Sequence, residues 1–339
     1  KGWFFARPNP RILNSHRPQE ISNRFEALQI SCQNHSSMSP CPVTYSRKHV
    51  MSHPLRVSPS LMSNNLTSNK SLLAYARAEA VIVSNHGDNK LTSLPFSDKV
   101  QVKGVKYMDF GWICVLAVTM VDGFQLWSRD GSRMLFFHPV RPANDSGSCF
   151  VRGVGIVKGR NEFLVGDSSG AMHTFLMAQA SSGRGLNVKN TKGIREHGSA
   201  ISDISCSEEY CVSADDRGSF CVFDINSAEP SGGHNLMSKR LFINAEVGFP
   251  CTSIAVHGEV FVAAFSSGHL RYYDLSTGDL CVEVAAHSRC ITAVALNADA
   301  SIISTVSEDC VLSVWTLPES PADGDQVELI FTDHVEDRQ

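Results

Sequence analysis

The stretch SSGHLRYYDLSTGDL (Ser266–Leu280) places a glycine at a turn, then alternating side chains, then the pair Tyr273 and Asp274, and then a second turn. The same plan occurs upstream in DRGSFCVFDINSAE (Asp216–Glu229) and downstream in EDCVLSVWTL (Glu308–Leu317). A plan that recurs along a chain predicts a repeated structural unit.

Five copies of this unit can be aligned on the aromatic residue near the end of the alternating stretch. The aligned residues are Trp127, Phe175, Phe223, Tyr273 and Trp315. Their spacings are 48, 48, 50 and 42 residues, slightly above the roughly 40–45 residues of common propeller repeats. In four copies a glycine precedes the aromatic by four or five residues: Gly123, Gly170, Gly218 and Gly268. In the last copy Cys310 takes that place. A hairpin turn needs the positive φ that glycine adopts without strain, so each copy predicts two strands joined by a tight turn.

Each copy divides into four strands, as the copy around Tyr273 shows. Its expected strands are CTSIAV (251–256), EVFVAAF (259–265), HLRYYDL (269–275) and LCVEVAA (280–286). The first two are almost wholly apolar, which is typical of strands that are covered on both faces. A ring of such sheets covers both faces of each sheet, so we predict an all-β fold, a β-propeller of four-stranded antiparallel blades.

Six blades are visible when a fainter copy at residues 72–96 is included. His334 follows His287 by 47 residues, one repeat length, and we therefore expect a further unit to begin there. We predict seven blades in the complete protein, with the propeller covering residues 61–339 and truncated at its C-terminus.

Residues 1–60 differ from the rest of the chain. They are rich in Ser, Pro, His and Asn, carry eight basic residues against two acidic ones, and show no period of a strand or helix. Such a composition predicts a disordered basic segment. Met51 is an expected start of the native protein, so residues 1–50 are expected to be translated leader; a basic transit peptide is the alternative.

The last copy carries a chain of residues suited to mutual hydrogen bonding. In AHSRCITAVALNADASIISTVSEDCVLSVWTL (286–317), these are His287, Thr305, Asp309 and Trp315. Their order and spacing resemble the structural tetrad of the WD-repeat family, in which a His precedes the first strand, a Ser or Thr lies in the second, an Asp at the next turn and a Trp in the third. Trp donates, the hydroxyl and the imidazole do both, and the carboxylate accepts, so all four can be satisfied while buried.

The resemblance to the WD-repeat family implies a non-catalytic propeller that acts as a scaffold for protein or peptide partners. At the rim we interpret Phe249 in EVGFPC (246–251), Arg289 and His197 as candidate partner contacts, because aromatic residues and Arg dominate protein interfaces. Packing of Phe249 within its own loop is an equal alternative. Self-association through an exposed sheet edge is a third possibility for this chain.

The alternative function is a propeller-fold enzyme of the hydrolase type. Such an enzyme needs several ionisable groups that converge on the central channel. The expected first strands offer mainly hydroxyl groups and one carboxylate: Ser202, Asp203, Thr252, Ser253 and Thr292. One carboxylate is not the pair that glycoside hydrolysis requires, and we therefore predict no catalytic, cofactor or metal site.

Composition narrows the partners and the compartment. A formal charge of −4 gives no reason to expect nucleic acid, and the longest apolar run, WICVLAVTMV (112–121), is too short to span a bilayer. The 11 cysteines show no zinc-ligand spacing and fit reduced core thiols, which indicates a cytoplasmic protein. The basic stretch SSGRGLNVKNTKGIREH (181–197) favours a solvated outer strand, with peripheral contact to phosphate, membranes or vesicles as its alternative.

Overall fold

The computed structural model describes most of the chain after residue 60, and two short segments before it. The described residues are 23–28, 50–55, 60, 62–77, 79–85, 90–96, 100–140, 149–157, 159–180, 185–225, 237–244, 248–297, 302–316 and 327–334. For residues 23–28, 50–55 and 192 it describes the backbone alone. Over these residues it contains strands and no helix, and hence no helix long and apolar enough to cross a membrane.

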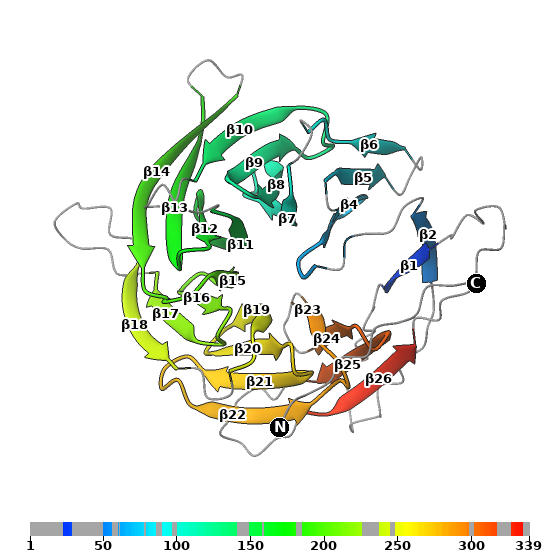
Figure 1. Ribbon diagram of the computed structural model, residues 1–339, viewed down its shortest axis with the longest axis vertical. Helices are drawn as coiled ribbons and strands as arrows, with labels where there is room; N and C mark the ends of the chain where they lie inside the picture. The colour runs from blue at the N-terminus through cyan, green and yellow to red at the C-terminus, as the bar shows by residue number, and fades with distance from the viewer. Residues whose placement is uncertain are drawn as a thin grey trace, which may run out of the picture.

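Six four-stranded antiparallel sheets stand around a common centre in the described part of the chain (Figure 1). The first three blades are β3 (Leu66–Asn69), β4 (Leu72–Ala76), β5 (Val81–Asn85), β6 (Leu91–Ser93); β7 (Val102–Asp109), β8 (Cys114–Met120), β9 (Gly123–Ser128), β10 (Met134–Pro139); and β11 (Val151–Val157), β12 (Glu162–Asp167), β13 (Ala171–Gln179), β14 (Leu186–Arg195). The next three are β15 (Ile201–Cys206), β16 (Tyr210–Asp215), β17 (Phe220–Asp224), β18 (Ser238–Ile243); β19 (Cys251–His257), β20 (Val260–Phe265), β21 (His269–Asp274), β22 (Leu280–Ala285); and β23 (Ile291–Leu296), β24 (Ile302–Ser307), β25 (Val311–Thr316), β26 (Leu329–His334). The predicted propeller of four-stranded blades is confirmed.

Two further strands lie within residues 1–60. β1 (Asn23–Leu28) pairs with β2 (Val50–Leu55) in an antiparallel two-stranded sheet, and Figure 1 shows this pair between the first and the sixth blade. Apart from these strands and Ser60, the segment predicted to be disordered lies outside the described residues.

The core lies between neighbouring blades. Phe124 of β9 packs against Phe163 of β12 and Phe175 of β13, with ring centroids 5.9 and 5.0 Å apart. Two blades further on, Phe220 of β17 meets Phe261 of β20 at 5.1 Å. The apolar face of each of these sheets is therefore covered by the neighbouring blade, which explains why the strands are apolar on both faces.

Side chains also join the innermost strands of neighbouring blades, where the backbones do not pair directly. The Tyr107 amide donates to Thr67 Oγ1 (3.0 Å), Lys106 Nζ to the Val154 carbonyl (2.6 Å), Arg152 Nε to the Ile201 carbonyl (3.0 Å), the Ile254 amide to Asp203 Oδ2 (3.0 Å) and the Val294 amide to Ser253 Oγ (3.3 Å). All five junctions between consecutive described blades, from β3–β7 to β19–β23, thus carry at least one such bond. These contacts fix the spacing of the blades around the ring.

The junction between the sixth and the first blade is different. Val306 of β24 is 36% exposed, whereas Ala264, its equivalent in the fifth blade, is fully buried. Leu66 on β3 of the first blade is 42% exposed. The structure places His334 within β26, paired with Val311, and not in a loop that leads into another blade.

Candidate partner-binding rim

One rim of the propeller is formed by the loops that lead into each innermost strand and by the turns between the second and third strands. Backbone hydrogen bonds tie these two kinds of segment together within a blade. The amide of Ser168 donates to Phe150, Asp216 to Ala200, Ser266 to Pro250 and Glu308 to Cys290, at 2.9–3.0 Å. The rim loops are therefore held by the same bond in four consecutive blades.

The turn glycines hold the rim loops of the following blade as well. Gly218 has φ +83°, and a Cβ there would lie 2.6 Å from the Phe249 carbonyl oxygen. A Cβ on Gly268 would likewise meet the His287 carbonyl. Positive φ and close approach thus require glycine twice over, and the turn positions the loop that carries Phe249 or Arg289. Cys310 adopts the same left-handed conformation, with φ 64°, without being a glycine.

The sixth blade brings His287, Thr305, Asp309 and Trp315 together. His287 Nε2 lies 2.8 Å from Thr305 Oγ1, which accepts from Trp315 Nε1 at 3.0 Å. His287 Nδ1 lies 3.1 Å from Asp309, whose carboxylate also accepts from the backbone amides of Ser288 and Val311 at 3.0 Å. Burial alone raises the pKa of Asp309, but these amides and His287 lower it below its ordinary value. The four residues form one buried chain that anchors the loop before β23 to the turn before β25.

The fourth blade contains a shortened version of this chain, and it uses His197. That residue is 3% exposed, with Nε2 2.8 Å from Ser213 Oγ and Nδ1 3.2 Å from Asp215. The structure thus places His197 in the interior, where it offers no surface to a partner, and we leave it out of the rim. Its carboxylate partner is Asp215, whereas Asp216 pairs with Arg152. Phe223, at the position of Trp315, has no N–H to complete the chain.

Phe249 and Arg289 lie on the rim and are exposed. Phe249 is 45% exposed, and its loop borders the turn that carries Arg217, which is also exposed. Arg217 was not singled out by the sequence, because an Arg in a turn is usually only solvated. The rim therefore presents an exposed aromatic side chain and two exposed guanidinium groups, those of Arg217 and Arg289, a combination suited to protein contacts.

The innermost strands use their polar groups for structure. Burial raises the pKa of Asp203, although the nearby Lys106 opposes this, and its carboxylate accepts from the Ile254 and Ile204 amides at 3.0 and 2.9 Å. Thr252 Oγ1 donates to the Ile291 carbonyl at 2.5 Å. Within the described residues, no three His, Cys, Asp or Glu side chains lie together as a metal site would require. The nine described cysteines are free thiols, five of them buried.

The model of the WDR54 family matches residues 97–339. The chain belongs to the WDR54 family. SADDRGSFCVF (213–223) and SEDCVLSVWTL (307–317) both lie within the matched residues, and the resemblance to WD repeats is confirmed.

Comparison with individual proteins agrees with membership of the WDR54 family. WD repeat-containing protein 54 of Mus musculus is 27% identical over 233 residues, which cover 66% of this chain and 66% of the relative. The chain thus spans about two thirds of the length of the curated relatives it matches. A chain in the crystal structure of the mitotic checkpoint complex superimposes with a TM-score of 0.64 at 15% identity and covers 83% of both chains. The RRP9 WD40 repeats superimpose with a TM-score of 0.62 at 14% identity, covering 81% of this chain and 82% of theirs. Both structures show the fold.

Proposed function

We propose that this WDR54-family propeller is a non-catalytic scaffold that binds protein or peptide partners through the rim that carries Phe249 and Arg289. The observation that supports this most strongly is the exposure of Phe249, at 45%, on a loop whose backbone is fixed by Gly218. A large apolar side chain held in water gains free energy when a partner covers it. WD propellers generally mediate protein interactions, which agrees with this use of the rim.

The polar groups of the inner strands support a scaffold over an enzyme. Asp203, the carboxylate that an enzyme on this fold would use, accepts two backbone hydrogen bonds and is 5% exposed. Lys106 and Arg152 donate to carbonyls of the next blade. These groups are occupied in joining the blades.

Affinity capture from cells tests the proposal. The double variant Phe249→Ala/Arg289→Ala is compared with Phe137→Ala/Arg133→Ala, which removes an equally exposed Phe and an Arg from the outer edge of the second blade. We expect partners to be lost from the rim variant and kept by the edge variant. Identical partners for both variants would show that the rim is not the binding surface.

A further inference from the structure

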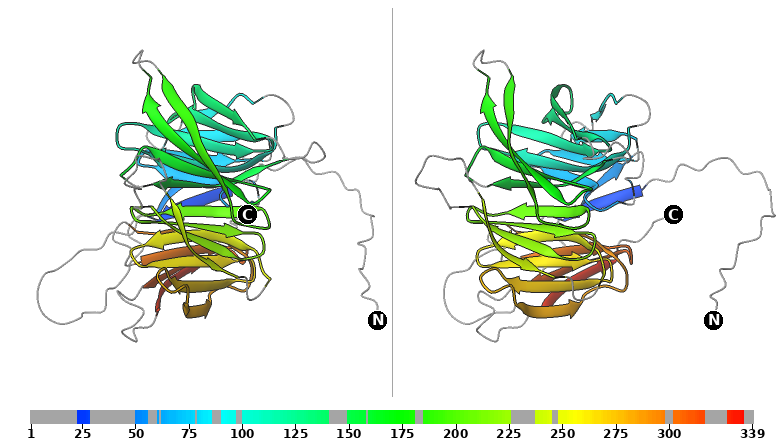
Figure 2. Two further views of the ribbon diagram at one scale, coloured as in Figure 1. Left: turned by 90° about the vertical axis from the view of Figure 1, so that its left-hand side faces the viewer. Right: turned by 60° about the vertical axis from the view of Figure 1, so that its left-hand side comes forward.

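The outermost strands of the third and fourth blades are unusually basic. β14 and β18 together carry five basic residues and no acidic one: Lys189, Lys192, Arg195, Lys239 and Arg240. The outermost strands of the next two blades have the opposite sign, with Glu283 in β22 and Asp333 in β26. β14 slants across the outside of the ring towards β18 (Figures 1 and 2). The side of the propeller thus has a basic sector over two neighbouring blades.

Part of this charge is balanced within the sector and part is not. Lys239 Nζ lies 2.6 Å from Glu196, and Arg240 lies 2.9 Å from Asp224. Lys189 and Arg195 are exposed and form no ion pair with any residue that the structure describes. The sector therefore keeps an excess of positive charge at its surface.

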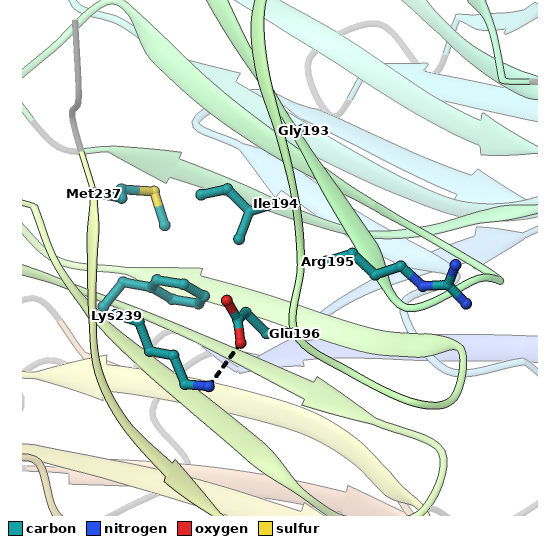
Figure 3. Close-up of a pocket in the computed structure, with 7 residues that line it drawn as sticks. Gly193, Ile194, Arg195, Glu196, Met237 and Lys239 are labelled. Atoms are coloured by element: carbon teal, nitrogen blue, oxygen red, sulfur yellow. Dashed lines mark hydrogen bonds and ion pairs between the residues drawn. The ribbon is translucent and has the colours of Figure 1, made fainter. Parts of the chain in front are cut away.

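A pocket of about 310 Å³ opens between the two strands. Ile194, Met237 and Phe223 give it an apolar floor, and the Lys239–Glu196 pair lies at its edge. Figure 3 shows Met237 and Ile194 facing each other across the pocket, while Arg195 points away along the surface. The pocket thus has apolar side chains on its floor and an ion pair at its edge, with the unpaired Arg195 on the surface beside it.

The pocket lies where the fourth blade departs from the sixth. Phe223 is at the position of Trp315, whose indole donates to Thr305. In the fourth blade the equivalent hydroxyl, Ser213 Oγ, bonds to His197 at 2.8 Å. Phe223, whose ring is smaller than the indole of Trp315, lines the pocket together with Met237.

We propose that this groove, the pocket with its flanking strands β14 and β18, binds an extended acidic peptide that inserts one apolar side chain between Ile194 and Met237. Both strands end the strand order of their sheets, so they present edges that an extended segment can follow. Carboxylates on either side of the apolar residue would face Arg195 and Lys239. A membrane surface fits less well, because the apolar groups are recessed, with Phe223 1% and Met237 7% exposed. The pocket includes neither Phe249 nor Arg289.

Fluorescence polarisation with synthetic peptides tests the proposal on the full chain. The probe is a labelled nonapeptide of Glu and Asp with one central Leu, and its control has Ser in place of Leu. Protein variants are Arg195→Glu, Lys239→Glu and Phe223→Trp. Arg133→Glu is the matched charge control, because Arg133 is exposed in the turn before β10 and lies in neither the groove nor the rim. Ile194→Gln supplies a second floor variant in case Phe223→Trp does not fold.

We expect the Leu peptide to bind more tightly than the Ser peptide. Its binding should weaken as the salt concentration is raised. Each charge reversal in the groove and each floor variant should weaken binding by about tenfold, whereas Arg133→Glu should leave it unchanged. Equal binding of the two peptides, or unchanged binding by the floor variants, would overturn the proposal that the groove binds an apolar side chain of the peptide. Failure of the peptide to bind would also overturn the proposal. If the protein then sediments with phosphatidylserine vesicles, the basic sector would be assigned to membrane binding instead. None of these variants changes Phe249 or Arg289, so the outcome at the groove does not decide the function of the rim.

Discussion

Asp309 shows how one side chain organises a blade. Its carboxylate accepts from the amides of Ser288 and Val311 and faces His287, so it joins the rim loop to the turn before β25. In the fourth blade Asp215 does the same work, accepting from the amides of Arg217 and Ser219 while it faces His197. Burial raises the pKa of Asp215, but His197 and these amides lower it overall.

Replacement of Asp309 by Asn should destabilise the protein at pH 7 by roughly 1 kcal/mol, because the ionised acceptor is lost. The pKa of Asp309 is lowered from its ordinary value of 3.8, so its contribution is present above that pH and is lost as pH falls through the lowered value. The difference in unfolding free energy between Asp309→Asn and the native protein should therefore shrink as the pH falls below 3.8. Urea unfolding at several pH values measures this. A difference that stays constant with pH would contradict the role of the charge.

The residue scale is also where prediction from sequence is most uneven. The tetrad of the sixth blade can be recognised because its hydrogen-bonding types occur at fixed spacing. The equivalent group in the fourth blade is harder to recognise, because its carboxylate is Asp215 and the spacing from Asp215 to Phe223 differs from that between Asp309 and Trp315. His197 is buried with Asp215 and Ser213 as its partners, and a rule based on the spacing of the sixth blade does not find that carboxylate.

At the scale of the element, the turn glycines couple one blade to the next. The strands themselves could be predicted, because period-two alternation and turn glycines mark them: all five aligned aromatics lie on third strands. The bonds between innermost strands could not, since Lys106 and Arg152 meet partners 48 and 49 residues away. Only the closed geometry of the ring brings those atoms together.

Replacement of Gly268 by Ala should destabilise the protein by about 2–4 kcal/mol, because a Cβ there adds a clash with the His287 carbonyl to the strain of positive φ. Gly111→Ala is the matched control. Gly111 has φ +79° but nothing within 4 Å of a Cβ, so the strain alone should cost about 1 kcal/mol. Urea unfolding of both variants separates the two effects. Equal losses of unfolding free energy in the two variants would mean that the contact between a Cβ at position 268 and the His287 carbonyl adds no destabilisation.

At the scale of the molecule, burial is uneven around the ring. The two innermost strands of the third to fifth blades are largely buried, while β23 and β24 of the sixth are only partly covered. Thr252 reaches the Ile291 carbonyl of the next blade, whereas Thr292, its equivalent in β23, bonds only within its own blade, to Val306. The innermost contact that joins the other blades has no counterpart at this junction among the described residues.

Amide hydrogens of the sixth blade should consequently exchange faster than those of the fifth. Local opening requires less free energy where fewer apolar groups are buried. We expect residues 291–296 and 302–307 to exchange roughly tenfold faster than residues 251–256 and 260–265. Hydrogen exchange with mass spectrometry measures all four segments in one sample. Equal protection would show that the sixth blade is stabilised as fully as its neighbour.

Site-specific photo-crosslinking in cells tests the proposed scaffold function most directly. Benzoylphenylalanine placed at Phe249 reports on the rim, and the same group at Phe137 reports on an outer edge of nearly identical exposure, 46% against 45%. The rim scaffold predicts discrete protein adducts from position 249 and none of the same adducts from position 137. The absence of adducts at 249, or the same adducts from both positions, would contradict a partner at the rim.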